Sequence, residues 1–496
     1  MRFNDDDTDI ITIVGTEIEG LMAALLLKQN FPTKNVKVLD VFKEWECRTP
    51  SQSSGYMFKE QFLTRLNINE HDFMVKTDAT YTIGSYYSGF GKTDFPNHLG
   101  SYPLFYSHNE YHCFQGYILG YKQLKNKWLA PNHFYDGDIP LIQDNFPMSY
   151  TFDTAKFRDY LLELCELNGC TMTTDVYTRV ELDNQQHIKK LHCSNGNYYM
   201  SDWWIDNTGP RRLLSSFIDF KWKSWEPHTP ASSHIYFETP AMEEYNLFTF
   251  YKAIDIGYLW RAPLYGKTTN GFTYNHDLQC KNGPDIHKLL EEIYKHPIDY
   301  KAKSNRYPVG CFDKMWYGNI ILLGQSGSLL EPLEGLNVML TLLQTNSLIN
   351  ALPGKDIKSV NEDYTDLMDN ILSYTQMHYL TQRTEPFWKK EIKQTDFLKE
   401  MLPRWQVRLP RDRDFTYRLK MFGPLSFINL ISGLDLYTKS RYEEEARLYS
   451  YSQRGWISAE LKRTKDWEEN CLRISHKEML KLIHTKNQSK TERIIY

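Results

Sequence analysis

The first part of the chain carries the clearest pattern of apolar positions. Residues 10–14 form a β-branched apolar run, which is typical of a buried parallel strand. Gly15 ends this run, and residues 20–29 are rich in strong helix formers. A second apolar run covers residues 36–39 and ends at Asp40. This order of strand, tight turn, helix and strand within about 30 residues predicts a βαβ unit of the dinucleotide-binding type.

Later apolar runs predict a sheet-rich middle and a helical end. Residues 90–150 are rich in Gly, Pro, His, Asn and aromatic residues, and we interpret them as loops over a sheet. Strand-and-glycine signals occur on both sides of the middle, so we expect the nucleotide-binding domain to be interrupted in sequence. Strands are expected over residues 80–83, 202–206, 320–323 and, as an antiparallel set, 232–275; helices are expected over 156–167, from 335, and through most of the chain after 356.

This pattern predicts an α/β fold. A Rossmann-like nucleotide-binding domain would carry an inserted antiparallel substrate sheet and a helical C-terminal part. We expect the Rossmann-like domain to comprise residues 1–89, 150–230 and 305–350, the substrate-side sheet and loops to comprise residues 90–149 and 231–304, and the helical part to comprise residues 351–496.

Composition and charge narrow the class of protein. The 496 residues include 58 Lys+Arg and 62 Asp+Glu, a formal net charge of -4, which gives no support to a nucleic-acid-binding surface. The 41% of hydrophobic residues is enough to bury a core. The chain has no apolar run of the roughly 18 residues that a membrane span needs. Its acidic start, MRFNDDDTDI, lacks the features of a signal peptide, so we expect a cytoplasmic protein.

Cysteine and histidine usage gives no sign of a metal site. The eight cysteines are spread over the chain without a CxxC pair, so reduced, mostly buried thiols are expected. His98, His108 and His112, with Cys113, lie in one stretch, but the ligand spacing of a metal site does not repeat there. We therefore expect no bound metal.

The turn between the first strand and the first helix departs from the dinucleotide-binding pattern. It begins at Gly15 and ends at Gly20, and Glu17 stands where the middle glycine of GxGxxG belongs. That glycine normally lets the backbone approach a pyrophosphate at the helix N-terminus. A carboxylate there adds bulk and a like charge, at a cost of roughly 1–4 kcal/mol. Asp40 lies where a ribose-binding acid is expected, although the turn could also bind no nucleotide at all.

Two later segments are more specific. Residues 318–337 read GNIILLGQSGSLLEPLEGLN, and residues 257–264 read GYLWRAPL. Together with the βαβ turn, these segments resemble the flavin-dependent tryptophan halogenases, a branch of the FAD monooxygenase superfamily. The resemblance extends along nearly the whole chain and implies an FAD/NAD(P)-binding Rossmann-like fold. Further blocks match this family in order at residues 66–70, 78–81, 152–157, 205–209, 378–381 and 385–388.

The resemblance also implies a reaction and a cofactor. Members of this family use FADH2, supplied by a separate flavin reductase, and O2 to oxidise a halide. The hypohalous acid then travels through a tunnel to an aromatic substrate. The implied partners are a small indole-like aromatic, a halide and the reductase, with no nucleic acid or membrane, and homo-oligomer formation stays open. The implied cofactor-binding residues are Gly15, Glu17, Gly20, Asp40, Gly324 and Gly327.

The family directs the halogen with a lysine that is helped by a glutamate. By resemblance, Glu334 keeps the glutamate, whereas the position of the lysine falls on Thr82, which has no amine. The structural alternative for Glu334 is an acid that only stabilises the N-terminus of the following helix. The halide site falls on Gly335 and Leu336, where the family has Ser-Thr.

The tunnel signature of the family is also altered. Its Trp-x-Trp-x-Ile-Pro pattern falls on Tyr258, Trp260 and Pro263, so the first tryptophan and the isoleucine are lost. Three hypotheses follow from these departures: a halogenase, a flavin monooxygenase or oxidase that does not halogenate, and a non-catalytic descendant that acts as a binding protein.

Overall fold

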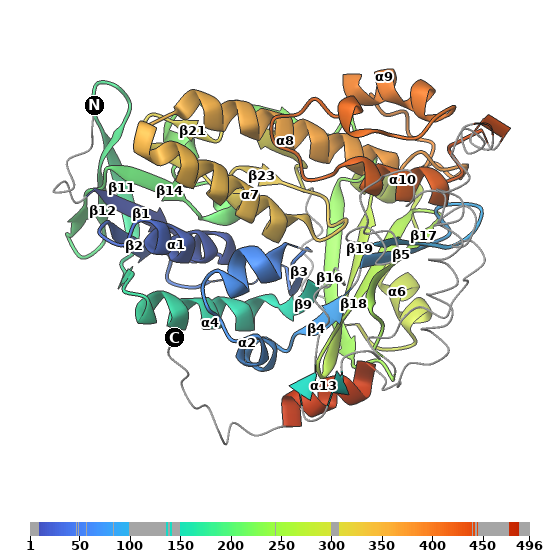
Figure 1. The fold of residues 1–496 in the computed structure, drawn as a ribbon, viewed down its shortest axis with the longest axis horizontal. Helices are drawn as coiled ribbons and strands as arrows, with labels where there is room; N and C mark the ends of the chain where they lie inside the picture. Colours follow the sequence, from blue (N-terminus) through green and yellow to red (C-terminus); the bar gives the residue numbers. More distant parts are fainter. Residues whose placement is uncertain are drawn as a thin grey trace.

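A parallel sheet assembled from separate parts of the chain forms one half of the molecule (Figure 1). The computed structural model describes residues 9–45, 47, 49–55, 57–82, 84–98, 135–136, 139–140, 149–243, 245–298, 307–438, 440–441, 444 and 476–485. In spatial order its strands are β10 (Thr171–Thr174), β2 (Asn35–Asp40), β1 (Ile10–Val14), β14 (Trp203–Asp206), β22 (Ile320–Leu322) and β21 (Trp316–Tyr317). Neighbouring strands run parallel, except β22 and β21, which run antiparallel.

A second sheet forms the other half of the molecule. Its neighbouring strands are antiparallel except β5 and β17, which run parallel. The domain boundary expected after residue 89 therefore falls between two strands of this one sheet. In spatial order the strands are β16 (Ser233–Pro240), β19 (Lys267–Tyr274), β18 (Gly257–Leu264), β17 (Phe248–Ile254), β5 (Gly84–Ser88) and β6 (Phe95–His98).

Smaller sheets and helices complete the described part of the chain. The short strands are β3 (Ser51–Ser53), β9 (Ser149–Asp153) and β4 (Thr80–Thr82); β11 (Tyr177–Leu182), β12 (Ile188–Cys193) and β13 (Tyr198–Tyr199); β15 (Trp222–Ser224), β20 (Gly310–Phe312) and β23 (Ser328–Leu329); and β7 (Tyr135–Asp136) with β8 (Ile139–Pro140). The α-helices are α1 (Ile18–Asn30), α2 (Glu70–Lys76), α4 (Thr154–Leu167), α5 (His276–Asn282), α6 (Ile286–Tyr294), α7 (Leu336–Ala351), α8 (Ile357–Met377), α9 (Asp396–Trp405), α10 (Pro424–Gly433) and α13 (His476–Thr485).

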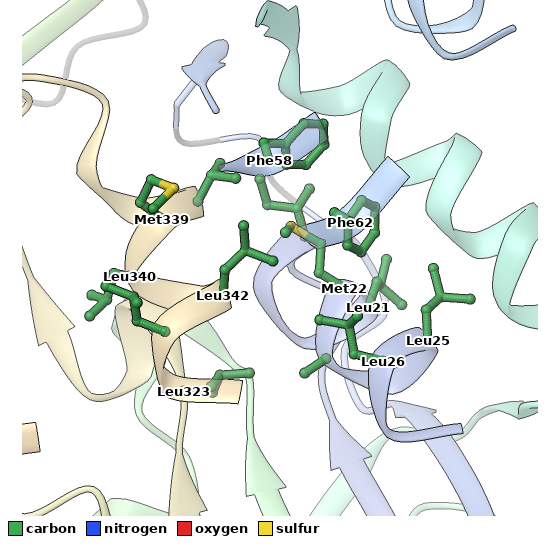
Figure 2. Packing of buried hydrophobic residues seen from close by; sticks show 14 of the residues in the cluster. Leu21, Met22, Leu25, Leu26, Phe58, Phe62, Leu323, Met339, Leu340 and Leu342 are labelled. Carbon is green, nitrogen blue, oxygen red and sulfur yellow. The ribbon is translucent and has the colours of Figure 1, made fainter. Parts of the chain in front are cut away.

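Helix α1 is buried on all sides and packs between α4 and α7. Figure 2 shows Leu21 and Leu25 of α1 in the same cluster as Leu342 of α7 and Phe62, a residue of the short helix at Lys59–Thr64. A helix that is apolar all round belongs in an interior position. This packing fixes the N-termini of α1 and α7 relative to each other, and both of these ends belong to the candidate site.

The predicted α/β fold class is confirmed. The βαβ unit, the strand before residue 206 and the helix that starts after Gly335 are present as expected. The helix expected from residue 156 begins at Thr154, because the Asp153 side chain caps its N-terminus by accepting the Lys156 N–H. The loops expected over residues 90–150 lie mostly outside the described residues. Within those residues, no helix combines the length and the apolar character that a membrane crossing requires.

Candidate functional site

The segment between β23 and α7 is shaped by two residues in the left-handed backbone region. Glu334 and Gly335 both have φ of 59°. A Cβ on Gly335 would lie 2.5 Å from the Cβ of Ser53, so glycine is required for the close approach of this segment to β3. Glu334 has a Cβ, so this backbone conformation is uncommon for it and costs about 1–3 kcal/mol, which the surrounding contacts must offset.

The Glu334 carboxylate is buried and held by donors from several elements. Ser85 Oγ of β5 donates to Oε2 at 2.9 Å, and Asn97 Nδ2 of β6 donates to Oε1 at 2.6 Å. The Tyr87 hydroxyl also donates to Oε1, and His378 Nε2 lies 3.5 Å from it. The Glu334 side chain is only 5% exposed. This carboxylate is therefore fixed in position by the second sheet and by the residue that follows α8.

Replacing Glu334 by glutamine is expected to destabilise the protein by about 1–3 kcal/mol, because donors that now face a carboxylate would meet an amide N–H₂ group. Urea unfolding followed by far-ultraviolet circular dichroism measures this loss. The matched control is Glu238→Gln, which breaks an exposed 2.7 Å ion pair with Lys267 and is expected to cost less than about 1 kcal/mol. Equal stability of the two variants would contradict the assignment of Glu334 as the centre of this network.

The structure does not bring Thr82 to this carboxylate. Thr82 Oγ1 lies 3.2 Å from the carbonyl oxygens of Gly84 and Leu247, to which it donates. Thr82 ends β4, which belongs to a small sheet, whereas Ser85 lies on β5 of the second sheet and reaches Glu334. Among the residues of this stretch, Ser85 and Tyr87 therefore contact Glu334, and the assignment of the family's lysine position to Thr82 stays a prediction.

A second carboxyl group, Glu331, lies in the same segment and was not singled out from the sequence. Tyr258 Oη donates to its Oε1 at 2.8 Å, and the Tyr379 hydroxyl donates to the same oxygen. Its other oxygen, Oε2, is buried without a hydrogen-bond partner. Burial raises the pKa of Glu331 to about 8. The pair of acids three positions apart, Glu331 and Glu334, is the sequence signal that could have drawn attention to it.

A small cavity of about 50 Å³ is lined by Glu331 and by Gly335, the neighbour of Glu334. Of the residues expected to line a tunnel or a halide site, Trp260, Gly335 and Leu336 line this cavity. Tyr258 instead donates to Glu331, and the Pro263 carbonyl accepts a hydrogen bond from Thr80 Oγ1 at 2.8 Å. The complete lining is Thr49, Ser51, Gln52, Ser53, Tyr236, Thr249, Tyr251, Trp260, Ala262, Tyr307, Leu330, Glu331, Pro332, Gly335, Leu336 and Asn337.

The N-terminus of α1 keeps the shape of a dinucleotide-binding turn but not its charge. A Cβ on Gly15 would lie 2.3 Å from the Asn207 carbonyl oxygen, and one on Gly20 would meet the Asn207 side chain. Both glycines thus allow β1 and α1 to pack closely on the segment after β14. Glu17 precedes α1, and its Oε2 accepts the Trp45 Nε1–H at 3.1 Å. A carboxylate therefore stands where this turn ordinarily meets a phosphate.

A second acid follows in the first turn of α1. Glu19 is buried, and its Oε1 lies 3.4 Å from Gln325 Nε2. Burial, and then the charge of Glu17, raise the pKa of Glu19 to about 7. A Cβ on Gly324, whose φ is 55°, would lie 2.6 Å from Glu19 Cγ. Gly324 therefore serves to pack the turn after β22 against α1, and the Gly327 N–H closes that turn on the Gly324 carbonyl.

Asp40 is the last residue of β2 and lies near the guanidinium of Arg158. Its carboxylate lies 3.8 Å from Arg158, whose guanidinium also donates to the Thr16 carbonyl and hydroxyl oxygens and stacks on the Trp45 ring at 4.6 Å. The predicted cofactor residues Gly15, Glu17, Gly20 and Asp40 are thus gathered around the start of α1. Throughout the described ranges, no three His, Cys, Asp or Glu side chains are grouped as a metal site would require.

Comparisons with known proteins agree on one family. The chain matches the tryptophan halogenase family over residues 10–448. It is 21% identical over 480 residues to the 7-chloro-L-tryptophan 6-halogenase KtzR of Kutzneria sp., covering 85% of this chain and 90% of that enzyme. It is 24% identical to the tryptophan 6-halogenase SttH of Streptomyces toxytricini over 301 residues, which spans 57% of that relative.

Solved structures show the same fold along nearly the whole chain. The crystal structure of a tryptophan halogenase from Shewanella frigidimarina NCIMB 400 matches with a TM-score of 0.85 at 18% identity, covering 97% of this chain and 98% of that one. The flavin-dependent halogenase BrvH from Brevundimonas sp. BAL3 matches with a TM-score of 0.78 at 18% identity, covering 96% and 99%.

Proposed function

We propose that this chain, which belongs to the tryptophan halogenase family, is a flavin-dependent oxidoreductase that halogenates a small, indole-like aromatic substrate. The observation that carries the proposal is the fixed position of Glu334, the acid that the family pairs with its lysine. Four side chains from β5, β6 and the end of α8 hold this carboxylate just before α7, next to Gly335, which lines the cavity. Burying a carboxyl group among fixed donors on a left-handed backbone costs free energy, and a role in catalysis at this position would account for that cost.

Enzymes of this family use FADH2, which a separate flavin reductase supplies. Gly15, Gly20 and Asp40 retain the form of the turn that holds such a cofactor, whereas Glu17 places a negative charge at the phosphate position. The backbone of this turn therefore fits the pyrophosphate of FAD, but the Glu17 carboxylate repels that pyrophosphate, at a cost of roughly 1–4 kcal/mol. When bound, reduced flavin supplies the electrons that activate oxygen.

The residues at the start of α7 would then act on the halide and on the aromatic. The backbone N–H groups at Gly335 and Leu336 lie at a helix N-terminus, where an anion is stabilised. Trp260 lines the same cavity. Glu334 offers a fixed acceptor for a proton or for a polarised donor near the aromatic substrate.

A second candidate, a flavin monooxygenase that does not halogenate, is favoured by one observation. The β5 side chains that contact Glu334, Ser85 and Tyr87, carry hydroxyls, which have neither the amine nor the positive charge of the family's lysine. Within the described residues, no lysine or arginine forms an ion pair with Glu334, and His378 is its nearest nitrogen base. Glu334 and His378 could transfer a proton in an oxygenation reaction as well as in a halogenation.

A product assay separates these candidates. The purified chain is supplied with FAD, a flavin reductase and its reductant, oxygen, an indole or tryptophan, and chloride or bromide. Halogenation is expected to give a product whose mass follows the halide supplied. A hydroxylated product that is independent of halide would favour the second candidate. Absence of FAD binding in either redox state would contradict both candidates and favour a non-catalytic binding protein.

A further inference from the structure

His378, the residue that follows α8, is a buried histidine with a fixed hydrogen bond at Nδ1. Its side chain is only 1% exposed, and Nδ1 lies 3.1 Å from the backbone carbonyl oxygen of Tyr374. A carbonyl oxygen can only accept a hydrogen bond, so Nδ1 carries a proton. The charge of the ring therefore depends on Nε2, because an imidazole that is protonated on both nitrogens is a cation.

The Nε2 atom of His378 faces oxygen atoms. It lies 3.0 Å from the Tyr87 hydroxyl oxygen and 3.5 Å from Oε1 of Glu334. The Tyr87 hydroxyl has one proton and donates it to Oε1 of Glu334. The Tyr87 oxygen is then an acceptor, and an Nε2–H of His378 is in place to donate to it. The opposite arrangement, in which Tyr87 donates to Nε2, would require Oε1 of Glu334 to hold a proton of its own.

The other contacts of Glu334 are those of an ionised carboxylate. Asn97 Nδ2 donates to Oε1 at 2.6 Å, so this oxygen accepts from Asn97 as well as from Tyr87. Ser85 Oγ donates to Oε2 at 2.9 Å. Hydrogen bonds that are donated to a carboxylate favour its charged form. A buried carboxylate also needs a compensating charge, because an unpaired charge in a protein interior is strongly destabilising.

His476 of α13 is a buried histidine with the opposite partner at Nε2. Its Nδ1 lies 3.2 Å from the Tyr245 backbone carbonyl oxygen, the same arrangement as in His378. Its Nε2, however, accepts the backbone N–H of Tyr81 at 3.3 Å, so this nitrogen has no proton. Burial lowers the pKa of His476 to about 4, and the ring is neutral at pH 7. The two histidines thus share burial and the bond at Nδ1, and they differ in the atom that faces Nε2.

We propose that His378 is an imidazolium that forms a buried ion pair with Glu334, bridged by the Tyr87 hydroxyl. His378 is then a positioning residue, because its charge keeps the buried Glu334 ionised and therefore able to accept a proton. The use of this acceptor on an aromatic substrate rests on the proposed function, whereas the ion pair itself does not. Among the residues that the structure describes, no lysine or arginine pairs with Glu334 in its place.

The other titratable groups around the pair are neutral at pH 7. Glu331 lies three positions before Glu334, and burial raises its pKa to about 8, so it is largely protonated at pH 7. The neighbouring hydroxyls belong to buried tyrosines, and burial raises the pKa of each of them: Tyr87, Tyr251, Tyr258 and Tyr374. An imidazolium at His378 therefore balances the negative charge of Glu334.

Nitrogen-15 NMR of the full chain, labelled at its histidines and free of flavin, tests the proposal. The two nitrogens of an imidazolium have similar chemical shifts, whereas those of a neutral ring differ widely. At pH 7, His378 is expected to show the first pattern and His476 the second. The His378 signals are assigned by correlation through the ring carbons and by their loss in His378→Gln. A neutral pattern for His378 in the unaltered protein would overturn the proposal.

Two glutamate variants test the origin of the charge. Glu334→Gln removes the carboxylate but keeps its size, so His378 is expected to lose the Nε2 proton and to show the neutral pattern of His476. Glu331→Gln is the matched control, since it replaces an acid that is largely neutral at pH 7 and should leave His378 protonated on both nitrogens. A doubly protonated His378 in Glu334→Gln would also overturn the proposal. These measurements involve no halogenation, so failure of the ion pair would leave the proposed function standing.

Discussion

Replacing Glu17 by glycine is expected to raise the affinity of the chain for FAD by about fivefold to several hundredfold, which corresponds to removing roughly 1–4 kcal/mol of like-charge repulsion. The physical reason lies at the N-terminus of α1, where the backbone N–H groups would favour a diphosphate but the Glu17 carboxylate opposes it. Trp45 would lose its acceptor, but this half-buried indole can turn to water. Flavin fluorescence during titration of the protein with FAD measures the change.

Two controls identify the cause of the change in FAD affinity. Riboflavin carries no phosphate, so its affinity is expected to be the same for the protein and for Glu17→Gly. The pKa of Glu19, raised to about 7, adds a pH dependence, because the neutral acid present below pH 7 repels a diphosphate less than the carboxylate present above it. FAD affinity should thus fall as the pH rises through 7. In Glu17→Gly this fall should move to lower pH, because the charge of Glu17 helps to raise that pKa. Equal FAD affinity for both proteins would mean that Glu17 does not face the phosphate.

Ser85→Lys is expected to increase halogenation by about tenfold or more if the missing amine limits the reaction, because a lysine here would lie beside Glu334 and could carry or polarise the halogen. The site is buried, so the longer side chain must displace neighbours, and a loss of about 1–3 kcal/mol in stability is expected as well. Product mass after a reductase-coupled reaction measures the gain, and urea unfolding measures the loss.

Thr82→Lys is the matched control for this experiment. Thr82 is equally buried, but its hydroxyl faces main-chain carbonyls rather than a carboxylate, so a lysine there gains no ionic partner. It is expected to destabilise the fold without increasing halogenation. A gain from Thr82→Lys and none from Ser85→Lys would show that the lysine position is the one assigned from sequence.

The surroundings of Glu334 show which features local sequence patterns can predict and which they cannot. Apolar periodicity predicted the βαβ unit and the helix after Gly335, because both depend on local patterns. The step from β4 to β5 is different, since the chain leaves one sheet and enters another within a few residues. Counting along a sequence cannot fix which side chain faces a partner after such a break, because a shift of one residue reverses the faces of a strand.

The hydrogen-bond partners of Glu331 and Glu334 could not be predicted from local sequence patterns either. Glu331 could be seen in the sequence, but its tyrosine donors come from β18 and from the segment after α8, far away along the chain. Only the tertiary arrangement places both hydroxyls on one oxygen and leaves the other free. Glu17 is the opposite case, because a missing glycine at a known turn position was visible at once and the structure places its carboxylate at the start of α1.

The interrupted parallel sheet has a consequence for biosynthesis. β14 pairs with β22 although the whole of β16 to β19 is inserted between them in sequence. While the ribosome is still synthesising that insertion, the nascent β14 has one unpaired edge of backbone N–H and C=O groups. Nascent chains with such edges associate with one another, and pairing across a long insertion is slow. Productive synthesis of this protein therefore depends on keeping that edge shielded until Ile320–Leu322 has left the ribosome.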